Sequence, residues 1–188
     1  MSLLPAFKIG IWNAWLFMSV FLLQMIPILF VDKHIREKSH VPAEAKRSKS
    51  EKYAGIIGNT VCFLALGYSV FLPLQPGTFW FNAGLAVFIA GSIVLATATA
   101  NFITTPAEQM ITRGMYQLSR HPMYLATFLI YLGTGLATLS WLFMLLSLVM
   151  ILCFHREALV EEKYCLDKYG DAYREYMGRV PRWFLLLK

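Results

Sequence analysis

The sequence predicts an all-α fold: an integral membrane bundle of five transmembrane helices, with helices 4 and 5 forming a hairpin and a cytoplasmic helical extension following it. Three observations predict this fold class. The 188 residues are 57 % hydrophobic and 15 % charged, with a mean hydropathy of +0.54, which is too apolar for a soluble domain of this size. Several stretches are long and uncharged, and the Lys and Arg residues gather in two segments.

Three uncharged stretches, 9–31, 54–74 and 79–100, each reach the roughly 20 residues that a helix needs to cross a bilayer. A fourth, 122–154, has 33 uncharged residues, which is long for one helix and short for two full spans. We interpret it as a tight helical hairpin that turns near Thr138 and Ser140. Gly133 and Gly135 would allow close helix approach there.

Charge distribution favours the hairpin over a single helix. Segment 32–52 carries seven Lys and Arg residues, segment 155–188 carries another seven, and the connection 75–78 carries none. Basic segments stay on the cytoplasmic side of a membrane, so both segments lie inside only if 122–154 crosses twice. This predicts five helices, with the N-terminus outside and the C-terminus inside. The net charge of +6 is then explained by membrane sorting, and nothing supports nucleic-acid binding.

The chain after the hairpin predicts a helix that Gly170 ends, a second short helix over 171–177, and a stop at Pro181. We expect a single domain over 1–188, in which 1–100 is scaffold and 101–188 is the catalytic part. The loop 41–52 is expected to be a solvated connector without a catalytic role. Three isolated cysteines and four histidines without HExxH spacing support neither a disulfide nor a metal site.

Two polar clusters flank the hairpin. RHPMY at 120–124 is typical of a helix start, because Pro122 lacks the N–H that would be unsatisfied there anyway. His155, Arg156, Glu157, Glu161 and Glu162 follow the second arm. Each residue alone has a plain interpretation, such as a membrane anchor or a solvated helix face. The antiparallel hairpin, however, brings both clusters to one membrane depth, and this favours a site.

The order R-H-P-x-Y, an uncharged hairpin, R followed by EE, then YGDAYREY and VPRW, resembles the isoprenylcysteine carboxyl methyltransferase family and its relatives, which include phospholipid N-methyltransferases. The resemblance covers 109–183. It implies S-adenosylmethionine as methyl donor, with one of the two adjacent glutamates contacting it. The implied cofactor-binding residues are Gln109, Met110, Ile111, Thr112, Tyr116, Arg120, His121, Tyr124, Glu161 and Glu162. The implied catalytic positions are Arg156 and Glu157.

The resemblance thus implies methyl transfer to the C-terminal carboxylate of a prenylated cysteine, or to a similar lipophilic carboxylate, at the cytoplasmic face of the membrane. Such a carboxyl group, with a pKa of about 3.3–3.7, is ionised at neutral pH and needs no base. Arg156 would orient it with its planar guanidinium, and the lipophilic tail would enter from the membrane lipids. The alternatives are methylation of a lipid amine, which needs a base such as His121 or a glutamate, a nicotinamide-dependent membrane reductase, and a non-enzymatic membrane scaffold.

Overall fold

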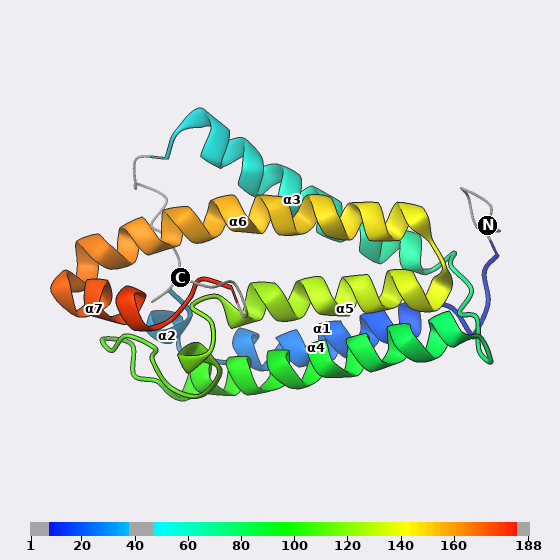
Figure 1. Ribbon diagram of the computed structural model, residues 1–188, viewed down its shortest axis with the longest axis horizontal. Helices are drawn as coiled ribbons and strands as arrows, with labels where there is room; N and C mark the ends of the chain where they lie inside the picture. The colour runs from blue at the N-terminus through cyan, green and yellow to red at the C-terminus, as the bar shows by residue number, and fades with distance from the viewer. Residues whose placement is uncertain (1–7, 38–46, 184–188) are drawn as a thin grey trace.

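The structure is a computed structural model, and it describes residues 8–37 and 47–183 (Figure 1). The described residues form helices and no strand, which confirms the predicted all-α class. The elements are α1 (Trp15–Leu29), α2 (Lys33–Glu37), α3 (Lys49–Ser69), α4 (Phe79–Thr104), the 3₁₀ turn η1 (Gly114–Gln117), α5 (Pro122–Thr138), α6 (Trp141–Tyr169) and α7 (Asp171–Arg179). The long helices run side by side along one axis, with α2 and α7 at one end and the α5–α6 turn at the other.

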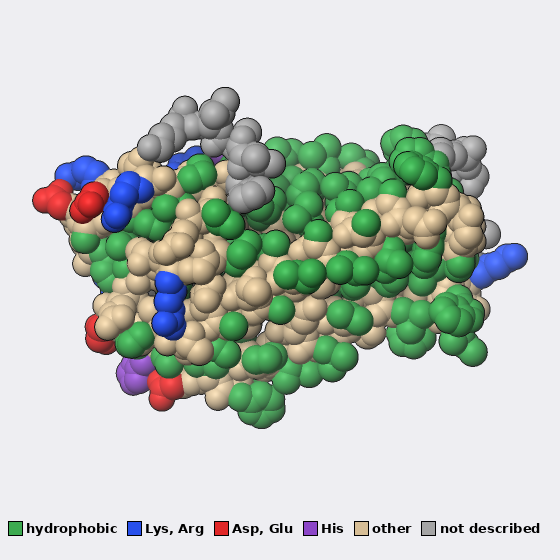
Figure 2. Space-filling view, turned by 60° about the horizontal axis from the view of Figure 1, so that its bottom comes forward, with side chains coloured by type: hydrophobic (Ala, Val, Ile, Leu, Met, Phe, Trp, Pro, Cys, Tyr) green, Lys and Arg blue, Asp and Glu red, His purple; other side chains and the backbone are tan. Residues whose placement is uncertain are grey.

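Length and composition qualify two of the described helices, α4 and α6, as membrane spans. Helices α1 and α5 are apolar but shorter, with 15 and 17 residues, so five membrane crossings stay a prediction. Figure 2 shows hydrophobic side chains spread over the sides of the bundle. Large exposed hydrophobic residues of the long helices include Leu64 of α3, Ile93 of α4, and Leu148 and Leu152 of α6, which suits a surface that faces lipid.

The first two long helices begin and end elsewhere than their apolar stretches predict. Stretch 9–31 does not become helical until Trp15, because 8–14 pairs with the chain after α3: the Ala14 N–H donates to Leu72 O at 2.8 Å, and Asn13 Nδ2 donates to Val70 O at 2.7 Å. Helix α3 covers 49–69 rather than 54–74. Ser48 and Glu51 form a capping box at its start, in which each side chain accepts a hydrogen bond from the other residue's backbone N–H.

The predicted hairpin is confirmed as α5 and α6. Leu139 takes the left-handed conformation, with φ of 54°, and ends α5. Ser140 then caps α6 by accepting a hydrogen bond from the Phe143 N–H at 3.2 Å. Gly135 lets Met144 approach, because an added Cβ would lie 2.7 Å from Met144 Cγ. The turn therefore lies where the sequence predicts it.

Helices α4 and α5 pack almost backbone to backbone through glycines. A Cβ added at Gly133 would lie 2.6 Å from Gly84 O, and one added at Gly84 would lie 2.5 Å from Gly133 O. Small residues permit such close contact between helices in a membrane, where dispersion replaces the hydrophobic effect as the driving force. This pairing fixes α5 against α4 near the end of α5.

Substituting Gly84 by Ala is expected to destabilise the fold by about 1–3 kcal/mol, because the methyl group would meet the Gly133 carbonyl and the Ala137 backbone, which cannot rotate away. Thermal unfolding in detergent measures the effect. Gly67→Ala is the matched control: a Cβ there meets nothing within 4 Å, so helix propensity should leave that variant equal to or up to ~1 kcal/mol more stable than wild type. Equal stability of the two variants would contradict the close packing.

The chain after the hairpin folds back over the start of α5. Gly170, with φ of 56°, ends α6, and α7 follows at once, which confirms the predicted second short helix. Tyr176 donates its hydroxyl hydrogen to Tyr116 O at 2.6 Å. Beyond α7, the Arg120 N–H donates to Pro181 O at 3.0 Å and Ser119 Oγ donates to Arg182 O at 2.8 Å. The C-terminal segment thereby encloses the polar cluster at 120–121.

Candidate functional site

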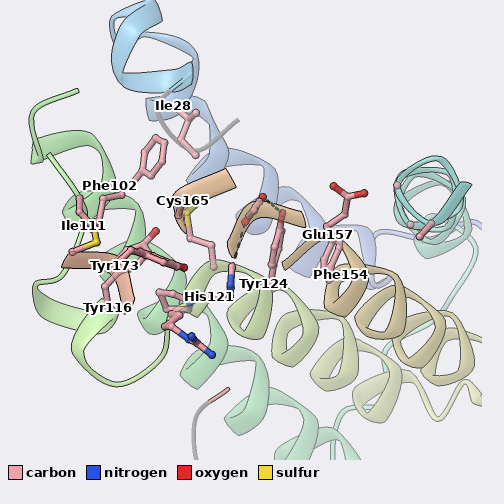
Figure 3. Close-up of a pocket in the computed structure, with 18 of the residues that line it drawn as sticks. Ile28, Phe102, Ile111, Tyr116, His121, Tyr124, Phe154, Glu157, Cys165 and Tyr173 are labelled. Carbon is pink, nitrogen blue, oxygen red and sulfur yellow. Dashed lines mark hydrogen bonds and ion pairs between the residues drawn. The ribbon is translucent and has the colours of Figure 1, made fainter. Parts of the chain in front are cut away.

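A cavity of about 900 Å³ lies at the end of the bundle where α5 begins. Figure 3 shows its lining: His121 and Tyr124 lie between Tyr116 and Tyr173 on one side and Glu157 and Phe154 on the other. Nine of the twelve residues that the sequence predicts for the site line this cavity, namely Gln109, Met110, Ile111, Tyr116, Arg120, His121, Tyr124, Glu157 and Glu161. The hairpin therefore brings the two predicted polar clusters together.

Glu162 lies behind the cavity wall and organises it. Glu162 is only 3 % exposed. Its carboxylate contacts three side chains, those of Arg120 and His121 before α5 and that of Arg182 after α7. Arg182 donates to both carboxylate oxygens, at 2.8 and 2.7 Å, in the two-pronged geometry that makes such pairs strong. Arg120 Nη2 lies 3.3 Å from Glu162 Oε1 and His121 Nε2 lies 3.2 Å from the same oxygen. One buried carboxylate thus holds the two site residues in place.

His121 and Tyr124 converge on Glu161, which lines the cavity. Tyr124 Oη donates to Glu161 Oε1 at 2.5 Å, and His121 Nδ1 lies 3.4 Å from Glu161 Oε2. Burial opposes charge on the imidazole, but hydrogen bonds to Glu161 and Glu162 outweigh it and raise the pKa of His121. Because both ring nitrogens face carboxylates, the protonated form can donate to both. The cavity wall is therefore a fixed, charge-paired surface.

Arg120 carries hydrogen-bonding capacity that the described residues do not use. Its side chain is 8 % exposed. Within 8–37 and 47–183, its Nε and Nη1 atoms are buried and have no hydrogen-bond partner. Buried donors are almost always satisfied in proteins, and Arg120 lines the cavity. The Nε–H and the Nη1 donors lie on different edges of the guanidinium, so each of them can donate to a separate acceptor atom of a ligand.

Aromatic residues form the wall of the cavity near η1 and α7. Tyr116, Tyr173 and Tyr176 are buried, and burial is the main cause that raises the pKa of each phenol above its ordinary value, so all three stay neutral. Met110 and Cys165 pack against Tyr173 and Tyr176. The result is a mostly apolar pocket wall that suits a flat, weakly polar group.

Three predicted residues do not line the cavity. Glu162 is the buried organiser described above. Thr112 is half-buried and does not line the cavity. Arg156 is exposed on the surface of α6 and does not line the cavity either. The helix turns Glu157 toward the cavity instead, because consecutive residues of a helix point about 100° apart. The neighbouring His155 contacts the C-terminal segment: Trp183 Nε1 donates a hydrogen bond to the unprotonated His155 Nδ1 at 3.2 Å.

Sequence reasoning missed two parts of the site. Arg47 and Lys52 line the cavity, although the loop 41–52 was expected to have no catalytic role. Arg47 Nη1 lies 3.2 Å from Glu157 Oε2. Arg182 was also missed, although VPRW was part of the recognised order. Nothing in one sequence marks residues 110 positions apart as partners; only the packing of α3 on α6 brings Arg47 and Glu157 together.

Similarity to known proteins identifies the family of this chain. The family model described as phospholipid methyltransferase matches residues 77–172, which is 96 of the 188 residues and so just over half of the chain. The chain belongs to the phospholipid methyltransferase family. The region of the phospholipid methyltransferase match holds α4, η1, α5 and α6, and therefore the RHPMY segment and both adjacent glutamates. Arg47 and Arg182 lie outside it.

Curated relatives refine the comparison. A protein-S-isoprenylcysteine O-methyltransferase of Schizosaccharomyces pombe is 36 % identical over 73 residues, covering 38 % of this chain and 31 % of the relative. Protein-S-isoprenylcysteine O-methyltransferase B of Arabidopsis thaliana is 30 % identical over 124 residues, covering 60 % and 63 %. These two relatives confirm the resemblance predicted from the motifs.

A third relative is named for a different reaction. A Delta(14)-sterol reductase of Mus musculus is 34 % identical over 128 residues, which cover 64 % of this chain and 28 % of the relative. The chain spans less than two thirds of the length of each of these three relatives. The shared framework therefore occurs in proteins named for two kinds of chemistry, and the residues of the cavity have to decide between them.

Proposed function

We propose that this protein transfers a methyl group from S-adenosylmethionine to the C-terminal carboxylate of a prenylated cysteine, or to a similar lipophilic carboxylate. The observation that carries the proposal is one cavity with two kinds of wall. Arg120, His121, Tyr124 and Glu161 give it a buried polar side, while Met25, Ile28 and Ile56 from α1 and α3 give it an apolar side. One wall suits a water-soluble donor and the other a lipophilic acceptor.

The polar side fits S-adenosylmethionine. A volume of about 900 Å³ is ample for a cofactor of that size together with part of an acceptor. The unpartnered Nη1 of Arg120 offers a hydrogen-bond donor to the methionyl carboxylate. Glu161 offers a carboxylate for a ribose hydroxyl or the ammonium group, and Tyr116 and Tyr173 provide an aromatic surface for the adenine. When bound, S-adenosylmethionine supplies an electrophilic methyl group on a positively charged sulfur.

The chain's own residues then have a modest chemical task. The acceptor carboxylate is already ionised at neutral pH, so no residue has to remove a proton. Anion and cation combine to neutral products, and a cavity that excludes water favours this loss of charge. The remaining contribution is alignment of the acceptor oxygen with the methyl group. The ordered cluster around Glu162 supports this alignment, because it leaves Arg120 and His121 little freedom.

We also propose the membrane arrangement that the charge pattern predicts, with one domain, five crossings and the cavity on the cytoplasmic side. The ends of the bundle support it: α2 and α7 lie at the same end (Figure 1), and this is the end that holds the cavity. The basic segments of the sequence thus flank the site, as cytoplasmic sorting of Lys and Arg would require. A lipophilic acceptor would reach the cavity between α1 and α3.

Methyl transfer from labelled S-adenosylmethionine tests the proposal, with N-acetyl-farnesylcysteine and phosphatidylethanolamine as acceptors in liposomes. We expect labelling of the farnesylated carboxylate. The family match favours phosphatidylethanolamine as the second candidate; an amine needs a base, and Glu161 lies in the cavity to serve as one. Labelling of the lipid alone would select that candidate. Labelling of neither acceptor, together with binding of a nicotinamide nucleotide, would select the reductase chemistry of the mouse relative.

A further inference from the structure

The cavity has a second charged region, away from Arg120, at the side formed by α3. Arg47 immediately precedes the capping residue of α3, and Lys52 lies in its first turn. Both line the cavity together with Glu157 of α6. Figure 3 shows Glu157 beside α3, on the opposite side of Tyr124 from Tyr116 and Tyr173. Arg47 and Lys52 thus lie on the same side of the cavity as Glu157.

The Arg47–Glu157 pair is looser than the structural pair of the same site. Arg47 Nη1 lies 3.3 and 3.2 Å from the two oxygens of Glu157, and toward this carboxylate the arginine uses only that nitrogen. Arg182 instead donates to the carboxylate of Glu162 from two nitrogens, Nε and Nη2, at 2.8 and 2.7 Å. The side chains of Arg47 and Glu157 are 24 % and 15 % exposed, and the side chains of Arg182 and Glu162 are 26 % and 4 % exposed, so the carboxylate of the first pair is the less buried one. A pair of this geometry positions the guanidinium without consuming all five of its donors.

A glycine makes room for this arrangement. A Cβ added at Gly55 would lie 2.6 Å from Glu157 Oε1 and 3.9 Å from Arg47 Nη1. The missing side chain lets the carboxylate lie against α3, where it meets Arg47. Glu157 thereby holds the arginine over the cavity rather than letting it extend outward into the surrounding water.

The cavity that Arg47 lines also has an apolar wall. Met25 and Ile28 of α1 and Ile56 of α3 belong to this wall. A cavity with both a cation and a hydrocarbon wall is complementary to an amphiphile with an anionic head and an apolar tail, since each part of such a molecule leaves water for a matching surface. Arg156, which the sequence suggested for this task, is exposed and lies outside the lining.

We infer that Arg47 binds the anionic group of the lipophilic methyl acceptor, with Glu157 holding its guanidinium in position. The inference rests on the proposed function for the nature of the acceptor. It assigns the acceptor site to the start of α3, outside the region of the family match. Two sources could supply the anion: the carboxylate of a prenylated cysteine, or the phosphate of a phospholipid headgroup. Both are oxyanions that a guanidinium fork can bind.

The test separates acceptor binding from cofactor binding. Arg47→Ala and Arg47→Lys are compared with wild type and with Arg174→Ala, which removes an arginine that is 74 % exposed at its side chain. Calorimetry measures S-adenosylmethionine binding. Direct binding and methyl-transfer kinetics are measured with N-acetyl-farnesylcysteine and with phosphatidylethanolamine in liposomes. We expect Arg47→Ala to weaken acceptor binding and raise the acceptor KM by at least ~10-fold, with cofactor affinity unchanged and Arg47→Lys intermediate.

Each outcome has a defined meaning. A loss confined to the farnesylated probe identifies a carboxylate as the bound anion, and a loss confined to the lipid identifies a phosphate. Unchanged binding of both probes in Arg47→Ala overturns the inference. Weakened acceptor binding in Arg156→Ala, together with wild-type binding in Arg47→Ala, also overturns it. Because binding is measured without turnover, wild type that binds a probe through Arg47 but transfers no methyl group would uphold the inference and reject the proposed function. Wild type that binds neither probe rejects the inference.

Discussion

Replacing Glu162 by Gln is expected to lower the free energy of unfolding by about 3–5 kcal/mol, because the change leaves buried positive groups without their negative partner. Glu162 is 3 % exposed, and Arg120, His121 and Arg182 all contact its carboxylate. Gln keeps the shape of the side chain but not its charge. Thermal and denaturant unfolding in detergent, followed by tryptophan fluorescence, measures the loss.

Glu175→Gln is the matched control for this prediction. Glu175 also pairs with an arginine, Arg179 at 3.6 Å, but the two side chains are 72 % and 69 % exposed. Exposed ion pairs contribute about 0–1 kcal/mol, so this variant should unfold nearly like wild type. If both variants changed stability by the same small amount, Glu162 would not be the organiser of the site.

Arg120→Lys is expected to weaken S-adenosylmethionine binding by roughly 10- to 100-fold, which corresponds to the ~1.5–3 kcal/mol of a hydrogen bond to a charged group. Lysine keeps a positive charge near Glu162, but it lacks the Nε and Nη1 donors that are buried and unpartnered among the described residues. Calorimetry with S-adenosylmethionine and with its demethylated product measures the affinity.

Arg113→Lys serves as the control for Arg120→Lys. Arg113 follows the segment 109–111 of the cavity lining, but it is exposed and donates to Thr104 Oγ1 at 2.7 Å. Its replacement should leave cofactor affinity within about twofold of wild type, because it contributes no buried donor to the cavity. Undiminished affinity in a well-folded Arg120→Lys protein would reject the assignment of the Arg120 donors to the cofactor.

The sequence predicted the helices of the second half of the chain well because its signals are local. Pro122 marks the start of α5, the uncharged stretch contains one turn at Leu139, and Gly170 ends α6. The segments that carry the predicted site are therefore placed correctly, and Arg120, His121, Tyr124 and Glu161 meet in one cavity. The first two long helices were placed less well. The pairing of 8–14 with the segment after α3 involves residues far apart in the chain, and hydropathy does not report it.

By itself, the sequence determined the all-α class, the hairpin and the set of segments that form the polar wall, because helix periodicity, helix stops and charge segregation each depend on neighbouring residues. Only the tertiary structure decided which charged side chains face the cavity. Arg156 and Glu157 are adjacent in the chain, yet the helix turns one outward and the other toward Arg47. Likewise, Glu161 lines the cavity while Glu162 is buried behind it. A rotation of about 100° per residue separates the directions of the two side chains. The packing of α6 against α5 and the C-terminal segment determines which of them faces the cavity.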